Sequence, residues 1–387
     1  MGTVSLGRIT TMIDLRTLGS KLKKYRSQLT ETIDDVAVAT GIDPVRISSI
    51  ESGQIEPTGD EILILADYFH CDFRYFISNE RVAPFDQTET LYRAYGNNFT
   101  KKDRRGIQEF LFLCEVEEYL MTELGHSTKS FSFTPNGKFF KKHGEKAAEK
   151  LREFLGFAPT KLPRDIYSEF RKVGVHVFRR KLGNSNISGL FIRHPTAGRC
   201  ALVNLSEDVY RQRFSAAHEM AHAIFDAASE VSVTFLQTKT TDLREIRANR
   251  FASCFLMPPS FLKHLPSPSM WTDDDTRHWA NQMRVSCHAL GIALQDAGLI
   301  DESTASRIQS LRIPAEAKID PELPSNLSPR QLERKARLLE KGLSDFYVKL
   351  CFESFHSDVI SIGRLAEVLL CTQTELAEFA SLYGHSL

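Results

Sequence analysis

The sequence predicts a mainly α-helical chain with one small β-sheet, an α+β protein of several domains. Apolar residues recur at helical spacing over most of the chain. Only one stretch, from about residue 173 to residue 204, alternates apolar with polar residues or carries short apolar runs, as strands do. The length of 387 residues favours two to three domains.

Residues 14–78 are predicted to form a compact all-helical unit. Leu15, Leu18 and Leu22 recur at helical spacing in the first helix. Three further helices are expected, separated by Gly41 and by Gly53 with Pro57. Their ranges are Asp34–Thr40, Pro44–Ser52 and Asp60–Phe69.

Connecting helices and a linker are predicted for residues 79–160. An amphipathic helix is expected from Lys101 to about Leu124, and the Gly-, Pro-, Ser- and Lys-containing segment Ser127–Gly144 is typical of a linker. Two helices follow, Ala147–Leu155 and Pro163–Lys172.

The sheet and the residues that follow it define the remaining predicted domains. Strands are expected at Val173–Arg179, Ser188–Arg193 and Cys200–Asn204, with later helices at Asp274–Arg284 and His288–Ala297. These lie in a domain of residues 161–300. Four prolines mark 301–330 as a region whose latter part is a linker, and 331–387 is a carboxy-terminal helical region.

Composition excludes several classes of protein. Lys plus Arg and Asp plus Glu number 49 each, so any nucleic-acid contact must come from a local patch. The 7 cysteines include no CxxC pair, which indicates reduced thiols rather than a disulfide framework. Neither a secretory signal nor an apolar run of roughly 20 residues is visible, so a cytoplasmic protein without a membrane partner is expected.

A metal-binding motif lies on the helix predicted after the third strand. Ser206 can cap this helix, which is expected to run to about Ala228. His218 and His222 are four residues apart, so both imidazoles project from one face and can hold one ion. Glu219 is turned away from them and suits a general base acting on a water at the open metal position.

Two histidines need a third protein ligand to make a catalytic zinc site. Glu245 is the candidate, because it opens a downstream helix in which Ala248 and Ala252 permit close packing. Asp242 is the competing carboxylate. Imidazole and carboxylate ligands favour Zn²⁺ as the cofactor.

Several segments together resemble the ImmA/IrrE metallopeptidases, many of which follow an Xre-type helix-turn-helix in one chain. The resemblance covers most of residues 14–300 and extends to one segment near the end. It is carried by CALVNLSEDVYRQRFSAAHEMAHAIFD, EIRANRFASCFLMP, FTKKDRRGIQEFLFLCE, WANQMRVSCHALGIALQDAGLI and VISIGRLAEVLL. It implies a zincin-like fold, with His218, His222 and Glu245 as zinc ligands and Glu219 as catalytic base.

Two positions depart from the pattern of that family. Members often have glycine where this chain has Ala221, and histidine where it has Asp226. The second difference bears on the surroundings of the metal. The group that stabilises the tetrahedral oxyanion is not assigned by spacing, and Tyr210 and His264 are the candidates considered.

The segment TIDDVAVATGIDPVRISSIESGQIEPT resembles an Xre-type helix-turn-helix, whose second helix enters the major groove. Its charge opposes DNA binding, because residues 14–78 hold 11 acidic and 7 basic residues, a net charge of −4. Binding of a protein partner or dimerisation is therefore an open alternative. The expected base-facing residues are Asp43, Val45, Arg46, Ser48 and Ser49, and the expected phosphate contacts are Lys21, Lys23, Lys24 and Arg26.

The function expected from these features is that of a zinc metalloendopeptidase that cleaves a regulatory protein, such as a repressor or antitoxin-like regulator, in a stress response. Double-stranded DNA and a second copy of the chain, forming a homodimer, are the other partners considered. The alternatives are a DNA-binding transcriptional regulator or an antitoxin-like protein whose peptidase fold senses or docks without cutting.

Overall fold

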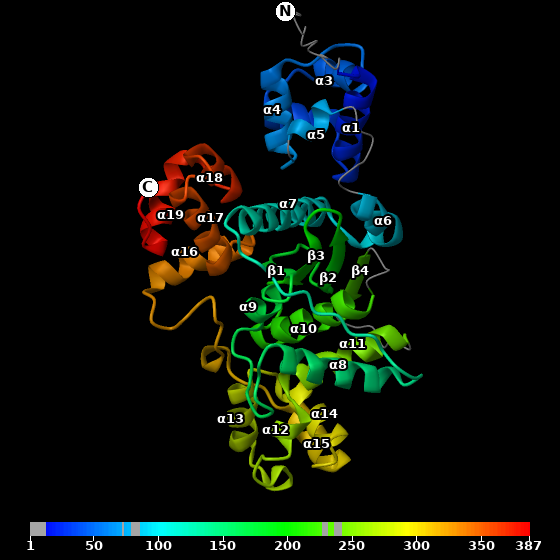
Figure 1. Ribbon diagram of the computed structural model, residues 1–387, viewed down its shortest axis with the longest axis vertical. Helices are drawn as coiled ribbons and strands as arrows, with labels where there is room; N and C mark the ends of the chain where they lie inside the picture. The colour runs from blue at the N-terminus through cyan, green and yellow to red at the C-terminus, as the bar shows by residue number, and fades with distance from the viewer. Residues whose placement is uncertain (1–12, 72, 79–85, 227–230, 236–241) are drawn as a thin grey trace, which may run out of the picture. The chain divides into compact units, whose positions relative to one another are not determined.

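The computed structural model describes residues 13–71, 73–78, 86–226, 231–235 and 242–387 (Figure 1). The chain folds as two compact units, Met1–Phe112 and Leu113–Leu387. Helix α7 (Lys101–Glu123) runs across the boundary between them. The predicted fold class, mainly α with a small sheet, is confirmed, since the second unit contains one four-stranded sheet among its helices.

The first unit is a helical bundle whose turns are set by capping residues. Thr32 and Asp35 form a capping box that starts the second helix, and Gly41 ends it with a φ of 73°. Asp43 then accepts backbone N–H groups at the start of the third helix. The helices are α1 (Leu15–Gln28), α2 (Ile33–Thr40), α3 (Pro44–Glu51), α4 (Gly59–Tyr68), α5 (Phe73–Ile77) and α6 (Asp86–Tyr95).

The sheet of the second unit has the order β1-β3-β2-β4. Strand β1 (Val175–Arg180) pairs parallel with β3 (Gly198–Asn204), and β2 (Ile187–His194) pairs antiparallel with β3 and β4. The edge strand β4 (Val231–Phe235) was missing from the predicted strands. Its alternation of Val and Phe with Ser and Thr is the signal that could have found it, although five residues make a short pattern.

Helices cover both faces of the sheet. Figure 1 shows the second half of α7 and helix α10 (Val209–Phe225) on opposite sides of the strands. Helix α11 (Leu243–Leu256) packs against α10 and against α8 (Phe140–Phe154). Gly144 of α8 permits this approach, because a Cβ there would lie 2.4 Å from the carbonyl oxygen of Arg247.

Some predicted element boundaries differ from those of the structure. Asp208, not Ser206, caps α10 by accepting the backbone N–H of Tyr210, and the helix ends at Phe225. Residues 227–230, to which the helix was expected to extend, lie outside the described residues. Helix α8 begins inside the predicted linker, whereas α15 (Glu302–Ser310) occupies the first part of 301–330, before the part predicted as a linker.

Two contacts join the carboxy-terminal region to the sheet of the second unit. Arg179 of β1 forms an ion pair with Asp320, in the loop before helix α16 (Pro329–Glu340), at 2.7 Å. The Lys181 N–H, just after β1, donates to the Glu340 carbonyl of α16 at 3.2 Å. No helix among the described residues is both long and apolar enough to span a bilayer. The remaining helices are α9 (Ile166–Arg171), α12 (Pro259–Leu262), α13 (Asp273–Met283), α14 (Cys287–Asp296), α16 (Pro329–Glu340), α17 (Asp345–His356), α18 (Ile362–Val368) and α19 (Gln373–Tyr383).

Candidate metal centre

Helix α10 presents two imidazoles side by side in the interior. His218 and His222 are 3% and 2% exposed, and their Nε2 atoms lie 3.1 Å apart. Their spacing of four residues places them on one face of the helix. Two nitrogen atoms therefore converge on a single point.

Glu245, in the first turn of α11, brings a carboxylate to the same point. Its Oε2 lies 3.2 Å from His218 Nε2 and its Oε1 lies 3.3 Å from His222 Nε2. Ligand atoms at the usual Zn–N and Zn–O distances around a tetrahedral ion are about 3.3 Å apart. The three residues therefore fit one zinc ion, with one ligand atom from each lying within 4.8 Å of the others.

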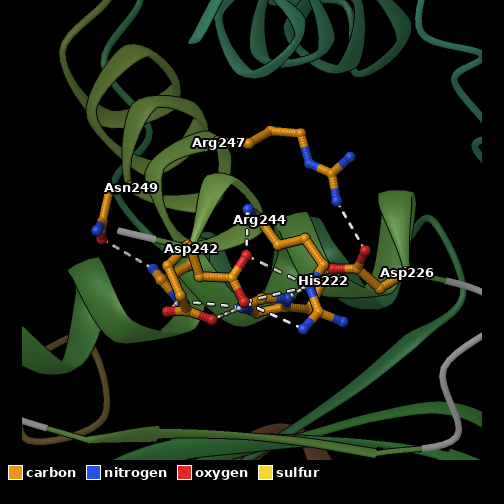
Figure 2. A network of polar contacts seen from close by, with 8 residues as sticks. His222, Asp226, Asp242, Arg244, Arg247 and Asn249 are labelled. Atoms are coloured by element: carbon orange, nitrogen blue, oxygen red, sulfur yellow. Dashed lines mark hydrogen bonds and ion pairs between the residues drawn. The ribbon is translucent and has the colours of Figure 1, made fainter. Parts of the chain in front are cut away.

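The other nitrogen of each histidine is held by a neighbouring side chain. His218 Nδ1 lies 2.9 Å from Asn249 Oδ1, and His222 Nδ1 lies 2.7 Å from Asp226 Oδ2. Arg247 in turn donates to Asp226 Oδ1 at 2.7 Å, as Figure 2 shows. Because both Nδ1 atoms are engaged, the Nε2 atoms face the common point.

The pKa values of His222 and Glu245 reflect the hydrogen bonds between them. Burial disfavours the charged imidazolium of His222, but hydrogen bonds to Asp226 and Glu245 outweigh it and raise its pKa to about 10. Burial also opposes the charged carboxylate of Glu245, yet hydrogen bonds from the two histidines lower its pKa. Since an imidazole binds a metal only in its neutral form, binding of an ion would release a proton from His222.

Loss of an outer partner is expected to weaken metal binding without removing a ligand. Asp226→Asn and Asn249→Ala should each lower zinc affinity about 10- to 100-fold, because the ligand ring loses its orientation and Asp226 also supplies charge. Competition with a chromophoric chelator measures this affinity. Asp296→Asn, on an exposed carboxylate paired with Arg250, is the control, and equal affinity in all four proteins would contradict the prediction.

Glu219 lies beside the converging ligands and is fully buried. Burial raises the pKa of its carboxyl, although the two histidines and the Thr234 hydroxyl favour the charged form. Its Oε1 lies over Gly189 of β2, where a Cβ would approach it to 2.9 Å. Thr234 of β4 pairs with Gly189 in the sheet register, which puts β4 next to this carboxylate.

The other candidates for this site are engaged elsewhere. Asp242 is the N-cap of α11 and forms an ion pair with Arg244 at 3.1 Å, outside the three-residue cluster. The Tyr210 hydroxyl donates to Asn281, and it also accepts a backbone N–H at 3.2 Å. His264 is hydrogen-bonded at 2.6 Å to a carbonyl oxygen of its own short helix. These contacts direct Tyr210 and His264 to structural roles.

The recognition helix α3 presents little positive charge. Arg46 forms a two-point ion pair with Glu61, in which Nη2 lies 2.8 Å from the carboxylate. Val45 is 74% exposed and Ser48 is exposed, whereas the Ser49 hydroxyl donates to its own helix at 2.8 Å. A DNA contact by Arg46 would have to replace the pair with Glu61.

Most of the basic side chains of α1 that were predicted to contact phosphate already form hydrogen bonds or ion pairs within the protein. Lys21 is buried and donates to two backbone carbonyls at 2.6 and 2.7 Å. Lys24 pairs with Glu89 at 2.9 Å and Arg26 with Glu51 at 2.6 Å. Among the phosphate contacts predicted from the sequence, Lys23 is the one that lies exposed with no such ion pair in the described part of the chain.

Two parts of the chain match known protein families. Residues 170–295 match the IrrE N-terminal-like domain, a peptidase family, and residues 22–76 match a helix-turn-helix domain. No curated protein matches the chain. The first match contains the metal cluster, and the second contains α2 and α3. The chain therefore joins a helix-turn-helix domain of the Xre type to a peptidase domain of the ImmA/IrrE family.

Proposed function

We propose that this protein is a zinc-dependent regulatory endopeptidase that cleaves a regulatory protein, and that its helix-turn-helix domain directs it to DNA. The observation that carries the proposal is the convergence of His218, His222 and Glu245 beside the buried carboxylate of Glu219. Burial raises the pKa of the Glu219 carboxyl, which suits a group that takes and returns a proton beside the ion.

Each residue has a separate part in the proposed reaction. His218, His222 and Glu245 would hold the ion, which when bound supplies a Lewis acid for peptide hydrolysis. Glu219, whose pKa is raised by burial, is suited to take a proton from the attacking water and to return it to the leaving amine. Asn249 and Asp226 fix the two imidazoles, and Gly189 gives the Glu219 side chain its space.

Glu219→Gln tests the proposal. The amide keeps the shape of the side chain but cannot accept a proton, so cleavage should fall at least about 100-fold while the zinc content stays at that of the wild type. Cells with either form are compared by quantitative proteomics for a regulator that is cut only by the wild type. Asp242→Asn, an exposed carboxylate outside the cluster, is the matched control.

A target that is cut equally in Glu219→Gln cells would remove the catalytic role of this carboxylate. A regulator that co-purifies uncut with both forms would instead favour docking or sensing by a peptidase fold without hydrolysis.

A further inference from the structure

Helices α18 and α19, near the end of the chain, repeat the construction of α2 and α3. Each first helix follows a hydroxyl residue, Thr32 or Ser361, whose side chain accepts the backbone N–H three residues further on. Each second helix follows a polar N-cap, Asp43 or Thr372. The same number of residues separates the two caps in both segments.

Buried positions coincide as well. Four residues of each segment are buried at the same offsets from the first cap, two on the first helix and two on the second. The pairs are Val36 with Leu365, Ala37 with Ala366, Ile47 with Leu376, and Ile50 with Phe379. Two helices that bury matching positions in this way cross with a matching geometry.

The turn between the helices is also equivalent. Gly41 has a φ of 73°, and Leu370, at the same offset, has a φ of 50°. Leucine rarely adopts this left-handed conformation, so packing rather than residue type imposes the turn here. In both turns the carbonyl oxygen at the same offset accepts the closing bond: Ala37 O accepts Gly41 N–H at 2.9 Å, and Ala366 O accepts Cys371 N–H, one residue later, at 3.1 Å.

We propose that α18 and α19 form a second helix-turn-helix, and that α19 reads double-stranded DNA. In this motif the first residues of the second helix contact base edges in the major groove. Gln373 and Thr374 occupy these positions and are exposed. A glutamine amide can bond both edge groups of adenine, and a threonine hydroxyl can bond either kind of partner. The Thr374 hydroxyl now shares a hydrogen bond with the Thr372 hydroxyl at 2.9 Å.

Nearby carboxylates are held within the motif and its neighbouring helix. Glu367 pairs with Arg364 at 2.5 Å, and Glu378 pairs with Arg334 at 3.2 Å. Glu375 accepts the backbone N–H of its own N-cap at 2.7 Å. The exposed Lys341 lies at the turn, with its Nζ 3.4 Å from the Leu370 carbonyl oxygen, and offers a phosphate contact.

Both helix-turn-helix motifs offer few cations for DNA phosphates, which is a reason for one chain to use two such motifs. Phosphate neutralisation supplies most non-specific affinity for DNA, so a motif whose arginine is paired, as Arg46 is with Glu61, binds weakly alone. Two weak modules in one chain gain affinity because the second binds at a high effective concentration. For both motifs to bind at once, one DNA duplex would have to contain two recognised sequence blocks.

Selection from a random-sequence duplex library with the full chain tests this proposal. The wild type should enrich duplexes with two separated sequence blocks. Thr374→Asp should erase one block and raise the Kd at least tenfold, and Ser48→Asp on α3 should erase the other. Ser325→Asp, which adds the same charge on an exposed loop, should leave both blocks and the Kd unchanged. Thermal unfolding of each variant confirms that the fold is retained.

Retention of both blocks and of the wild-type Kd in Thr374→Asp would overturn the proposal. Loss of binding in Ser48→Asp alone would show that the amino-terminal domain reads DNA while α19 serves another partner, such as a protein. Enrichment of no duplex by the wild type would overturn DNA reading by both motifs and leave the proposed hydrolysis untouched.

Discussion

His218→Ala is expected to reduce the zinc content of the purified protein from about one ion per chain to a background level. The substitution leaves His222 and Glu245, and two protein ligands are too few for a catalytic zinc site. Mass spectrometry of the native protein and of its acid digest measures the stoichiometry. His264→Ala, which removes an exposed histidine outside the cluster, should keep the full zinc content.

The same variant should lose its thermal response to zinc. Binding to the folded state alone stabilises the wild type by about 2.7 kcal/mol when free zinc is 100-fold above its Kd. Because His218 lies between Asn249 and Glu245 and joins α10 to α11, the metal links the same two helices. A rise in unfolding temperature on adding zinc to His218→Ala, equal to that of the wild type, would place the ion elsewhere.

The helical part of this centre could be predicted from the sequence because it depends on local spacing. His218 and His222 lie on one face of any α-helix, whatever surrounds it. The third ligand was less certain from the residues alone, which left Asp242 as a competitor of Glu245, because no local rule connects α11 to α10; the family resemblance favoured Glu245. The structure brings the three residues together through the packing of those two helices.

The outer partners of the ligands could not be predicted in the same way. Asn249 reaches His218 only because α11 packs against α10, and Arg247 reaches Asp226 by the same packing. The pairing of Arg46 with Glu61 likewise joins helices that a turn separates. Sequence patterns specify which side chains are present, whereas tertiary contacts decide which of them are already engaged.

Gly189→Ala is expected to stop the proposed cleavage while zinc binding persists. The added Cβ would lie 2.9 Å from Glu219 Oε1 and 2.9 Å from the Leu202 carbonyl oxygen. The Glu219 side chain can move away from the methyl group, whereas relief of the contact with Leu202, which pairs with Leu190 in the sheet, requires the strands to shift. The three atoms nearest to the new methyl group belong to Glu219 and Leu202 and not to the three proposed ligands.

Two measurements separate displacement of Glu219 from general damage to the sheet. Gly189→Ala should lose about 1–3 kcal/mol in urea unfolding, the usual cost of overpacking. The double variant Gly189→Ala with Glu219→Ala should lose less than the sum of the two single changes, because truncation of Glu219 relieves the contact. If Gly189→Ala keeps the zinc content of the wild type and leaves the regulator uncut, as Glu219→Gln is expected to do, the defect lies at this carboxylate. Full cleavage by Gly189→Ala would instead show that hydrolysis does not depend on where Glu219 lies, and the role assigned to it would then be wrong.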